Sequence, residues 1–371
     1  MYILFFLIPV VVWIVIAKLI WHHHFTVKEV VAQIIPTIIV ISTVFLVSDM
    51  YQTYDTKIIN GEVTSKNPKK ESCPIGWVKY TDSHCTEYFT RIVKVGETCS
   101  TDSEGKRTCT PNYDTEYNYI YPWERRYFVY SDINETYEIS RVDAQGVNFP
   151  PRFDGISIGD PVSATRSFKN YVMAASSSLF NVGNYENLDT ISIPYPAIYD
   201  YYKVDRVIDM TGIQSADFIK NWNVSLAEVN KNIRETEANV IVVLTNEDVS
   251  FAEKLQIIWQ GHNINDVIVV IGLNDKEISW VDVESWSSES MVNISLRDDI
   301  KNLNTIENFA FINDAIAQNV SQYFNVQTEQ DFEYLSNDIK PPMLTLLLAF
   351  IILLVLTPLV TYVFVKKIDL R

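Results

Sequence analysis

The chain has 371 residues, enough for two or three structural units, and 47% of them are hydrophobic, which excludes a wholly disordered protein. Thirty basic residues stand against 46 acidic ones, and the resulting net charge of −16 argues against a nucleic-acid partner. With only 11 glycines, the chain contains neither a GxGxxG nor a Walker-type loop, so the sequence does not support a glycine-rich nucleotide site.

Three apolar stretches predict transmembrane helices, over about residues 2–21, 30–47 and 343–365. Each approaches the roughly 20 residues that cross ~30 Å of hydrocarbon. A cleaved signal peptide is the alternative for the first stretch. Its first residues carry no base, however, and no small residues mark a cleavage site at its end. We therefore expect residues 1–48 to form a two-helix transmembrane hairpin and the chain to contact membrane lipid through three helices.

Basic residues beside the apolar stretches predict the orientation in the membrane. Lys18 and Lys28 flank the short loop between the first two stretches, and three more bases lie in the tail, 366–371. Because short cytoplasmic loops are enriched in Lys and Arg, we expect this loop and the tail to be cytoplasmic. The N-terminus and a large segment, about 49–341, would then be extracytoplasmic, which means periplasmic in a Gram-negative host.

All four cysteines fall in this outer segment: Cys73, Cys85, Cys99 and Cys109. No CxxC pair occurs, which argues against a zinc ribbon, and an even number of cysteines on an oxidising side predicts two disulfides. Four cysteines allow three connectivities. We favour Cys73–Cys85 with Cys99–Cys109, because a turn-forming stretch, Thr101 to Lys106, lies inside the second loop.

The outer segment divides into two parts and a linker. Residues 49–204 predict a β-rich subdomain, since apolar and polar residues alternate over 87–95 and 126–130. Turns are expected at Asn60-Gly61 and at Gly159-Asp160-Pro161. A tyrosine-rich stripe, 113–121, is expected to form one face of a sheet and its rim, with recognition of a sugar or peptide as the alternative.

Residues 205–328 predict a compact α/β subdomain with a mixed sheet, followed by a linker over 329–342. Buried strands are expected at 239–245 and 266–272, with a third, antiparallel strand at 277–283. Helices are expected at 225–236, where Ser225-Leu226-Ala227-Glu228 forms a capping box, at 249–260 and at 306–323. The whole chain is thus expected to be a membrane-anchored α+β protein.

The order of these elements, with the runs Val240–Thr245 and Val267–Gly272, resembles the TPM domain. This family is typically extracytoplasmic and membrane-tethered, and it often has glycine-rich segments near the later strands, where this chain keeps only Gly272. Upstream segments, among them Ile58–Thr64 and Ile158–Ser163, look like parts of predicted membrane proteins of tailed bacteriophages. The second resemblance implies location in a host inner membrane and a partner that is an envelope or viral membrane protein.

Catalytic motifs are scarce in the outer segment. It holds only two histidines, His84 and His262, neither in a GxSxG setting, and no HExxH motif occurs. TPM relatives include phosphatases and calcium-binding proteins, so the resemblance implies that acids near strand ends hold Ca²⁺: Glu247, Asp248, Asp275 and Asp282. The alternative is that the first two serve a helix N-terminus and that Asp275 serves a turn.

Two functions therefore remain open. The favoured one is a membrane-anchored binding or assembly module, in its phage form a host-envelope factor. The other is a weak metal-dependent phosphatase or calcium-binding domain, with calcium as the candidate cofactor. Convergence of three or more carboxylates in one pocket of residues 205–328 would favour the second, and their dispersion would favour the first.

Overall fold

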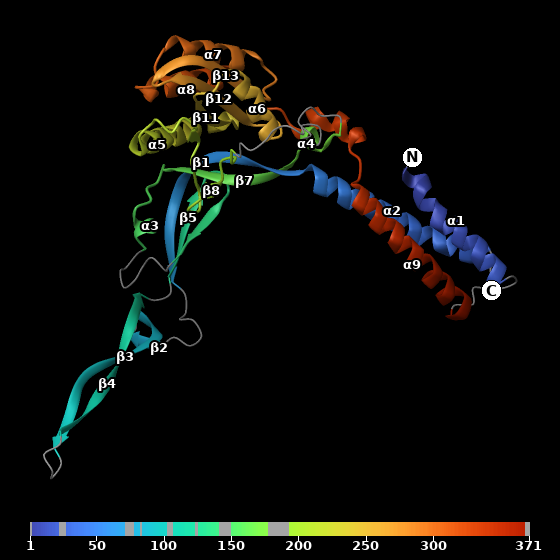
Figure 1. The fold of residues 1–371 in the computed structure, drawn as a ribbon, viewed down its shortest axis with the longest axis horizontal. Helices are drawn as coiled ribbons and strands as arrows, with labels where there is room; N and C mark the ends of the chain where they lie inside the picture. Colours follow the sequence, from blue (N-terminus) through green and yellow to red (C-terminus); the bar gives the residue numbers. More distant parts are fainter. Residues whose placement is uncertain are drawn as a thin grey trace.

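A computed structural model describes residues 2–21, 27–70, 78–81, 84–101, 107–122, 125–140, 150–176 and 193–367. Within them the protein is a mixed α+β molecule (Figure 1). A helical bundle carries both ends of the chain, a body contains two four-stranded sheets, and a β-ribbon extends from the body. The bundle and the ribbon leave the body in different directions (Figure 1).

The bundle consists of three apolar helices, α1 (Tyr2–Trp21), α2 (Val27–Thr53) and α9 (Met343–Lys367). Two of the described helices are long and apolar enough to cross a membrane, over Gln33–Thr53 in α2 and Met343–Val363 in α9. The corresponding part of α1, Ile8–Ile20, is shorter. All three predicted helices are present, and two of them meet the length and composition of a membrane span.

Contacts between these helices define their directions. Near the start of α1, Phe6 packs against the first half of α9 and against Phe45, late in α2. Further along α1, Trp13 Nε1 donates a 2.8 Å hydrogen bond to Thr361 Oγ1 in the second half of α9. Gln33 Nε2, early in α2, donates to the same oxygen. Hence α1 and α9 run parallel, and α2 runs antiparallel to both.

The first sheet of the body is antiparallel and has the strand order β6-β5-β1-β7. Its strands are β1 (Tyr54–Lys70), β5 (Arg125–Ser131), β6 (Thr136–Ile139) and β7 (Pro161–Lys169). The first half of β1 pairs with β7 and its second half with β5, and the register shifts between Val63 and Ser65. Val63, Tyr127 and Ile139 form the core beneath this sheet.

The turn predicted at Asn60-Gly61 is wrong, because both residues lie inside β1. A Cβ at Gly61 would overlap the Asp132 carboxylate, so glycine here permits close approach of the β5–β6 turn. Asn60 is buried and hydrogen-bonded to residues far away in the chain. These tertiary contacts override the local turn preference. The turn predicted near Gly159 is present, with φ of 90° at that glycine.

The ribbon consists of β3 (His84–Thr101) and β4 (Arg107–Pro122), with the short β2 (Val78–Thr81) beside the base of β3. Cys99 and Cys109 face each other across the two strands and form a disulfide. This confirms one of the two predicted bridges. The other depends on Cys73, which lies outside the described residues.

The second sheet has the order β10-β11-β12-β13. The strands β10 (Val207–Asp209), β11 (Asn239–Thr245) and β12 (Asp266–Asn274) are parallel, and β13 (Glu277–Ser285) is antiparallel. One face is covered by α5 (Ala216–Asn232), α7 (Met291–Asn302) and α8 (Phe309–Tyr323), and the other by α6 (Ser250–Ile258).

Alternate residues of the fully buried β11 serve the two faces of this sheet. Val240, Val242 and Leu244 face α5, α7 and α8, whereas Ile241 and Val243 face α6. The parallel strands lie side by side in chain order while α5 and α6 cover opposite faces. One of the two crossovers therefore has the left hand, which about 2% of such connections show.

The helix predicted to begin at the Ser225 capping box begins earlier, so that prediction is wrong. The N-cap of α5 is Ser215, whose Oγ accepts the backbone N–H of Phe218. The helix continues through Ser225, with Trp222 before it and Leu226 after it both fully buried. Ser225 Oγ accepts a hydrogen bond from Asn313 of α8. The sequence also does not predict β10 or α7. The strands expected at 239–245, 266–272 and 277–283 are present.

The bundle joins the body without a spacer, because α2 ends at Thr53 and β1 begins at Tyr54. Asn170 stabilises this junction with two hydrogen bonds. Its N–H donates to Thr53 O at 2.7 Å, and its Nδ2 donates to Asp55 Oδ2 at 2.8 Å. Its Oδ1 accepts the N–H of Met173 and so caps α4 (Tyr171–Ala174).

The second connection, expected as a linker over 329–342, contains the 3₁₀ helix η4 (Glu329–Asp338). Phe332 of η4 packs with Phe168 and Tyr171 on the body, directly before α9 begins. Both connections between the bundle and the body are therefore held by packing or hydrogen bonds.

Candidate functional site

The four acids predicted as metal ligands lie at or near the edge where the parallel strands end. Glu247 and Asp248 follow β11, Asp275 occupies the β12–β13 turn with φ of 59°, and Asp282 lies in β13 opposite Val270. Across the described part of the chain, no three of these carboxylates have oxygens within 4.8 Å of one another.

The carboxylate of one of these acids, Asp248, holds local backbone structure, whereas Asp275 makes its contact through the main chain. Asp248 Oδ1 accepts the backbone N–H of Ser250 at 2.8 Å where α6 begins, and hydrogen bonds from Ser250 lower the pKa of Asp248. The carbonyl of Asp275 accepts a hydrogen bond from Gln214. Asp282 instead stands beside Glu284, whose pKa is raised by burial and then by the negative charge of Asp282. This pair retains a proton more readily than an isolated carboxylate.

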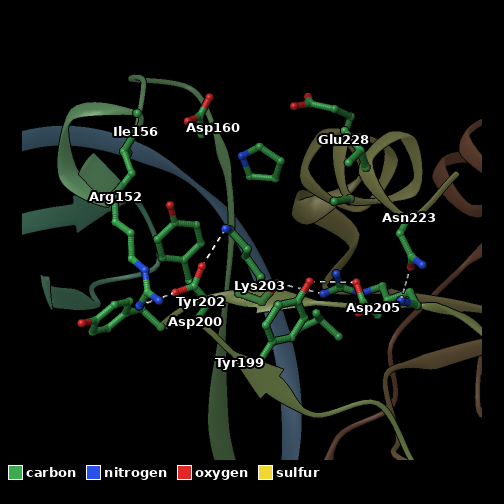
Figure 2. A pocket seen from close by; sticks show the side chains of 18 of the residues that line it. Arg152, Ile156, Asp160, Tyr199, Asp200, Tyr202, Lys203, Asp205, Asn223 and Glu228 are labelled. Carbon is green, nitrogen blue, oxygen red and sulfur yellow. Dashed lines mark hydrogen bonds and ion pairs between the residues drawn. The ribbon is translucent and has the colours of Figure 1, made fainter. Parts of the chain in front are cut away.

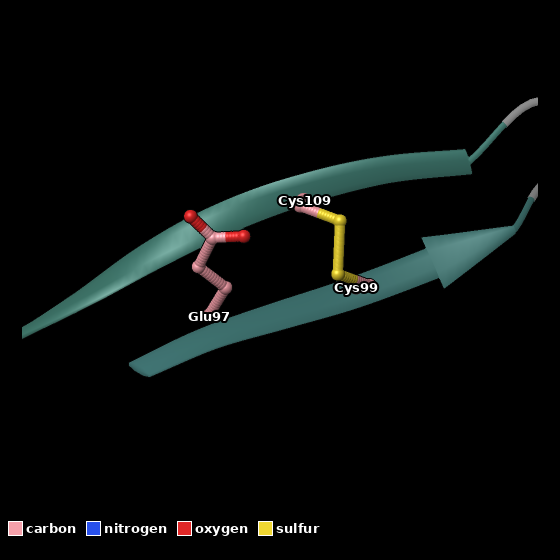
Figure 3. Close-up of side chains that lie close together, drawn as sticks. All are labelled: Glu97, Cys99 and Cys109. Atoms are coloured by element: carbon pink, nitrogen blue, oxygen red, sulfur yellow. A yellow bond between two sulfur atoms is a disulfide. The ribbon is translucent and has the colours of Figure 1, made fainter. Parts of the chain in front are cut away.

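A different group with metal-ligand spacing lies on the ribbon: Glu97, Cys99 and Cys109 (Figure 3). Both sulfurs are bonded to each other, so neither is a thiolate ligand in this state. Glu97 forms an ion pair with Lys94. The group as folded is a covalent link across the ribbon, and a Glu97 carboxylate alone is not a metal site.

The opposite edge of the second sheet, where the parallel strands begin, carries a buried polar network. Arg206, 2% exposed, directly precedes β10. Its Nε donates to Asn239 Oδ1 at 2.8 Å, and its Nη2 donates to Asn60 Oδ1 at 2.5 Å and Ser163 Oγ at 2.8 Å. One guanidinium thus ties β1 and β7 of the first sheet to β11 of the second. Burial lowers the pKa of Arg206 to about 10, so the group is charged at neutral pH.

The network continues to Asp266, which is fully buried. Its Oδ1 accepts a hydrogen bond from Asn239 Nδ2 at 2.8 Å, its Oδ2 accepts the N–H of Asn263 at 2.9 Å, and the Tyr195 hydroxyl donates to the carboxylate at 2.9 Å. Asn239 therefore bridges the cation and the anion. Burial raises the pKa of Asp266 to about 6, although these hydrogen bonds oppose the increase.

His262 lies beside this carboxylate, with Nδ1 3.9 Å from Asp266 Oδ2 and 3.0 Å from Asn263 O. Gln260, Gly261 and His262 all have positive φ, so a tight turn after α6 places the ring there. Burial lowers the pKa of His262 to about 4, and the imidazole is neutral at pH 7. It packs at 6.0 Å from the Trp286 ring.

Two cavities flank this network. The first, here called the α5 cavity, has a volume of about 560 Å³ and lies between α5, the loop 199–206 and the segment 151–163 (Figure 2). Arg206 contributes to its wall. Lys66 Nζ holds the segment behind another wall, because it donates to the carbonyls of Phe153, Asp154 and Ile156 at 2.7–3.1 Å, at the end of α3 (Pro151–Asp154).

The second, here called the His262 cavity, has a volume of about 480 Å³. His262, Asn263 and Tyr195 line it on one side, and residues of β1 and β7 line it on the other. A series of hydrogen bonds therefore runs from one cavity to the other, through Arg206, Asn239, Asp266 and Tyr195. Both cavities lie at the edge where the parallel strands begin. The metal ligands predicted from the sequence lie at the opposite edge, near the strand ends.

The sequence does not predict the roles of Arg206, Asn60 and Tyr195, because each forms its hydrogen bonds with residues that are distant in the chain. One signal was present: Asn239 and Asp266, polar residues, begin the two apolar runs read as buried strands. They are direct register partners in the parallel pair. Polar residues at the matching ends of two buried strands indicate a buried polar contact, because such groups are costly to bury unpaired.

No protein-family model, curated protein or solved structure matches this chain. The resemblances to the TPM domain and to phage membrane proteins stay predictions, and function has to be argued from the geometry of the chain itself.

Proposed function

We propose that this protein is a membrane-anchored extracytoplasmic binding or assembly module, whose ribbon contacts an envelope or viral membrane protein. The observation that carries the proposal is the ribbon itself. Within the described residues, β3 pairs with β4 and with β2, and none of these three strands pairs with a strand of the two sheets of the body.

Apolar side chains on the ribbon support a contact role. Ile92 is 69% exposed and Tyr113 is 62% exposed. Tyr113 pairs with Lys94, which lies two residues after Ile92, so the three side chains share one face. An isolated two-stranded ribbon is marginally stable in water, and exposed apolar groups on one face are typical of an interaction site. The Cys99–Cys109 bridge holds the strands together in the absence of a partner.

The anchor in this proposal has three spans, with the N-terminus and the body outside and the tail inside. The parallel course of α1 and α9 supports it, because both would then enter the membrane from the side of the body. A disulfide on the ribbon fits an oxidising compartment. The phage form of the proposal places the body in the periplasm of an infected host.

Site-specific photo-crosslinking from the ribbon tests the proposal. A photoreactive amino acid in place of Tyr113, in the full chain in its native membrane, should give a discrete adduct with one membrane or envelope protein. Tyr334 on η4 is the matched control, because it is also an exposed tyrosine, at 70%. Adducts of equal yield from both positions, or none above background from Tyr113, would contradict the proposal.

A further inference from the structure

The α5 cavity has a charge balance unlike that of the rest of the chain. Four basic and four acidic side chains line it, whereas the whole chain has a net charge of −16. Asp200 illustrates how these charges are arranged: it pairs with Lys203 at 2.7 Å and with Arg152 at 2.9 Å (Figure 2). A cavity lined by balanced charges selects neither anions nor cations, and it offers many donors and acceptors to a neutral polar ligand.

Tyr199 gives this cavity an exposed aromatic face. The residue ends β8 (Ile198–Tyr199) and is 47% exposed. Its hydroxyl donates a 2.9 Å hydrogen bond to Asp205 Oδ1, which fixes the orientation of the ring (Figure 2). Burial, followed by this hydrogen bond, raises the pKa of the hydroxyl to about 12, so the ring stays neutral. A fixed ring loses little conformational entropy when a ligand packs on it.

The backbone between β8 and β9 (Lys203–Val204) is strained. Asp200 has φ of 46° and Tyr201 has φ of 76°, in the left-handed region that non-glycine residues rarely adopt. Ion pairs hold Asp200, and the hydroxyl of Tyr201 accepts the N–H of Ser140 at 2.8 Å. Tyr202 and Lys203 directly follow this turn, and both line the cavity.

Two donors at the cavity have no hydrogen-bond partner among the described residues. They are the hydroxyl of Tyr202, a residue only 8% exposed, and the ammonium of Lys220 on α5. Backbone groups of the loop, in contrast, are already engaged. Tyr202 O accepts the N–H of Ser163 at 3.0 Å, and Asn223 Oδ1 accepts the N–H of Arg206 at 2.6 Å. Tyr202 and Lys220 are therefore side-chain donors that the cavity offers to a ligand.

We propose that the α5 cavity is a binding site for a neutral oligosaccharide. A sugar ring would place its C–H face on Tyr199, and its hydroxyl oxygens would accept hydrogen bonds from Tyr202 and Lys220. The sugar hydroxyls would donate to the carboxylates of the lining. A volume of about 560 Å³ is in the range of ligand sites, roughly 300–1,000 Å³.

Calorimetry with defined sugars tests this site. Cellotetraose, chitotetraose and maltotetraose would be titrated into the full chain in detergent micelles, with tetra-alanine as the peptide probe. We expect saturable heat with at least one sugar. Tyr199→Ala should weaken that affinity by about tenfold or more, because it removes the aromatic face. Tyr199→Phe keeps the ring and should weaken it only about two- to threefold.

Tyr334→Ala is the control for loss of an exposed tyrosine elsewhere, and it should leave sugar affinity unchanged. The absence of binding heat with all three sugars would overturn the proposal. Equal sugar affinities of the Tyr199→Ala and unmodified chains would also overturn it. Binding of tetra-alanine alone, lost in Tyr199→Ala, would overturn it in favour of a peptide site. The ribbon crosslink is a separate readout, so either proposal can fail while the other stands.

Discussion

Arg206 carries a positive charge into the junction between the two sheets, where it meets three neutral acceptors and, through Asn239, the anion of Asp266. Arg206→Met fills a similar volume but leaves those acceptors unpaired and the buried carboxylate without a countercharge. We expect the free energy of unfolding to fall by about 3–5 kcal/mol. Denaturant titration of the full chain in detergent, followed by tryptophan fluorescence, measures the change.

The matched comparison is a surface ion pair. Lys276 and Glu307 lie 3.3 Å apart with both side chains more than half exposed. Lys276→Ala should therefore change the free energy of unfolding by less than about 1 kcal/mol. If Arg206→Met lowers the free energy of unfolding no more than Lys276→Ala does, the Arg206 guanidinium does not hold the two sheets together.

Asp266 and His262 give opposite contributions to pH dependence. The pKa of Asp266 is raised to about 6, so the folded state binds its proton more tightly, and acidification from pH 6 towards 4 stabilises the fold through this group. The pKa of His262 is lowered to about 4, so acidification from pH 6.5 towards 4 destabilises the fold through the imidazole. In the native chain the two effects oppose each other over nearly the same window.

Removal of one group should expose the effect of the other. When the pH falls from 6.5 to 4, the free energy of unfolding of His262→Asn should rise by about 3 kcal/mol relative to that of the unmodified chain. Over the same change, the free energy of unfolding of Asp266→Asn should fall by a similar amount relative to that of the unmodified chain. The comparison with the unmodified chain removes the contribution of the many other carboxylates that titrate there. Denaturation at the two pH values measures this, and two variants that change in the same direction would contradict the assignment.

Elements with a strong local signal were predictable from the sequence, and those that depend on distant partners were not. The apolar runs of β11 and β12 suffice to identify buried strands, because every residue in them avoids water. The start of α5 was misplaced because Ser225-Leu226-Ala227-Glu228 has the pattern of a capping box but lies inside a helix that begins at Ala216. Asn60-Gly61 was misread because β7 and the β5–β6 turn fix its conformation. The α5 cavity is lined by residues of six elements, β6, α3, β7, β8, β9 and α5, which no local pattern places together.

Gly272 shows at the element scale how closely β12 and β13 depend on one residue. It pairs with Trp280, and a Cβ at this position would overlap the indole, whose Nε1 donates to Glu247 O at 3.0 Å. Gly272→Ala should displace the indole and lower the free energy of unfolding by about 1–3 kcal/mol. Denaturant titration measures the loss, and a shift in tryptophan emission reports the displacement.

Gly96 on the ribbon provides the control, since a Cβ there has no neighbour within 4 Å. Gly96→Ala should leave both the stability and the emission of the body unchanged. Equal effects of the two substitutions would mean that the contact with Trp280 is not what requires glycine at position 272.

At the scale of the whole molecule, the attachment of the bundle determines what the body can reach. The direct α2–β1 connection and the packing of η4 against the body limit rotation about the membrane anchor. Asn170 contributes two hydrogen bonds to this attachment, to Thr53 O and to Asp55 Oδ2. The ribbon leaves the body in a different direction from the bundle (Figure 1), and in our proposal that is where a partner in or near the membrane would be bound.

That arrangement depends on α1 crossing the membrane, and labelling of single introduced cysteines tests the crossing. Polar contacts of Trp13 and Gln33 with Thr361 hold α1 against α2 and α9, as expected for helices that pack within a bilayer. In intact cells a membrane-impermeant maleimide should label Tyr2→Cys and Tyr334→Cys from outside, and Lys367→Cys only after permeabilisation. Labelling of Tyr334→Cys but not Tyr2→Cys in intact cells would show that α1 does not span the membrane, and the bundle would then have an even number of crossings.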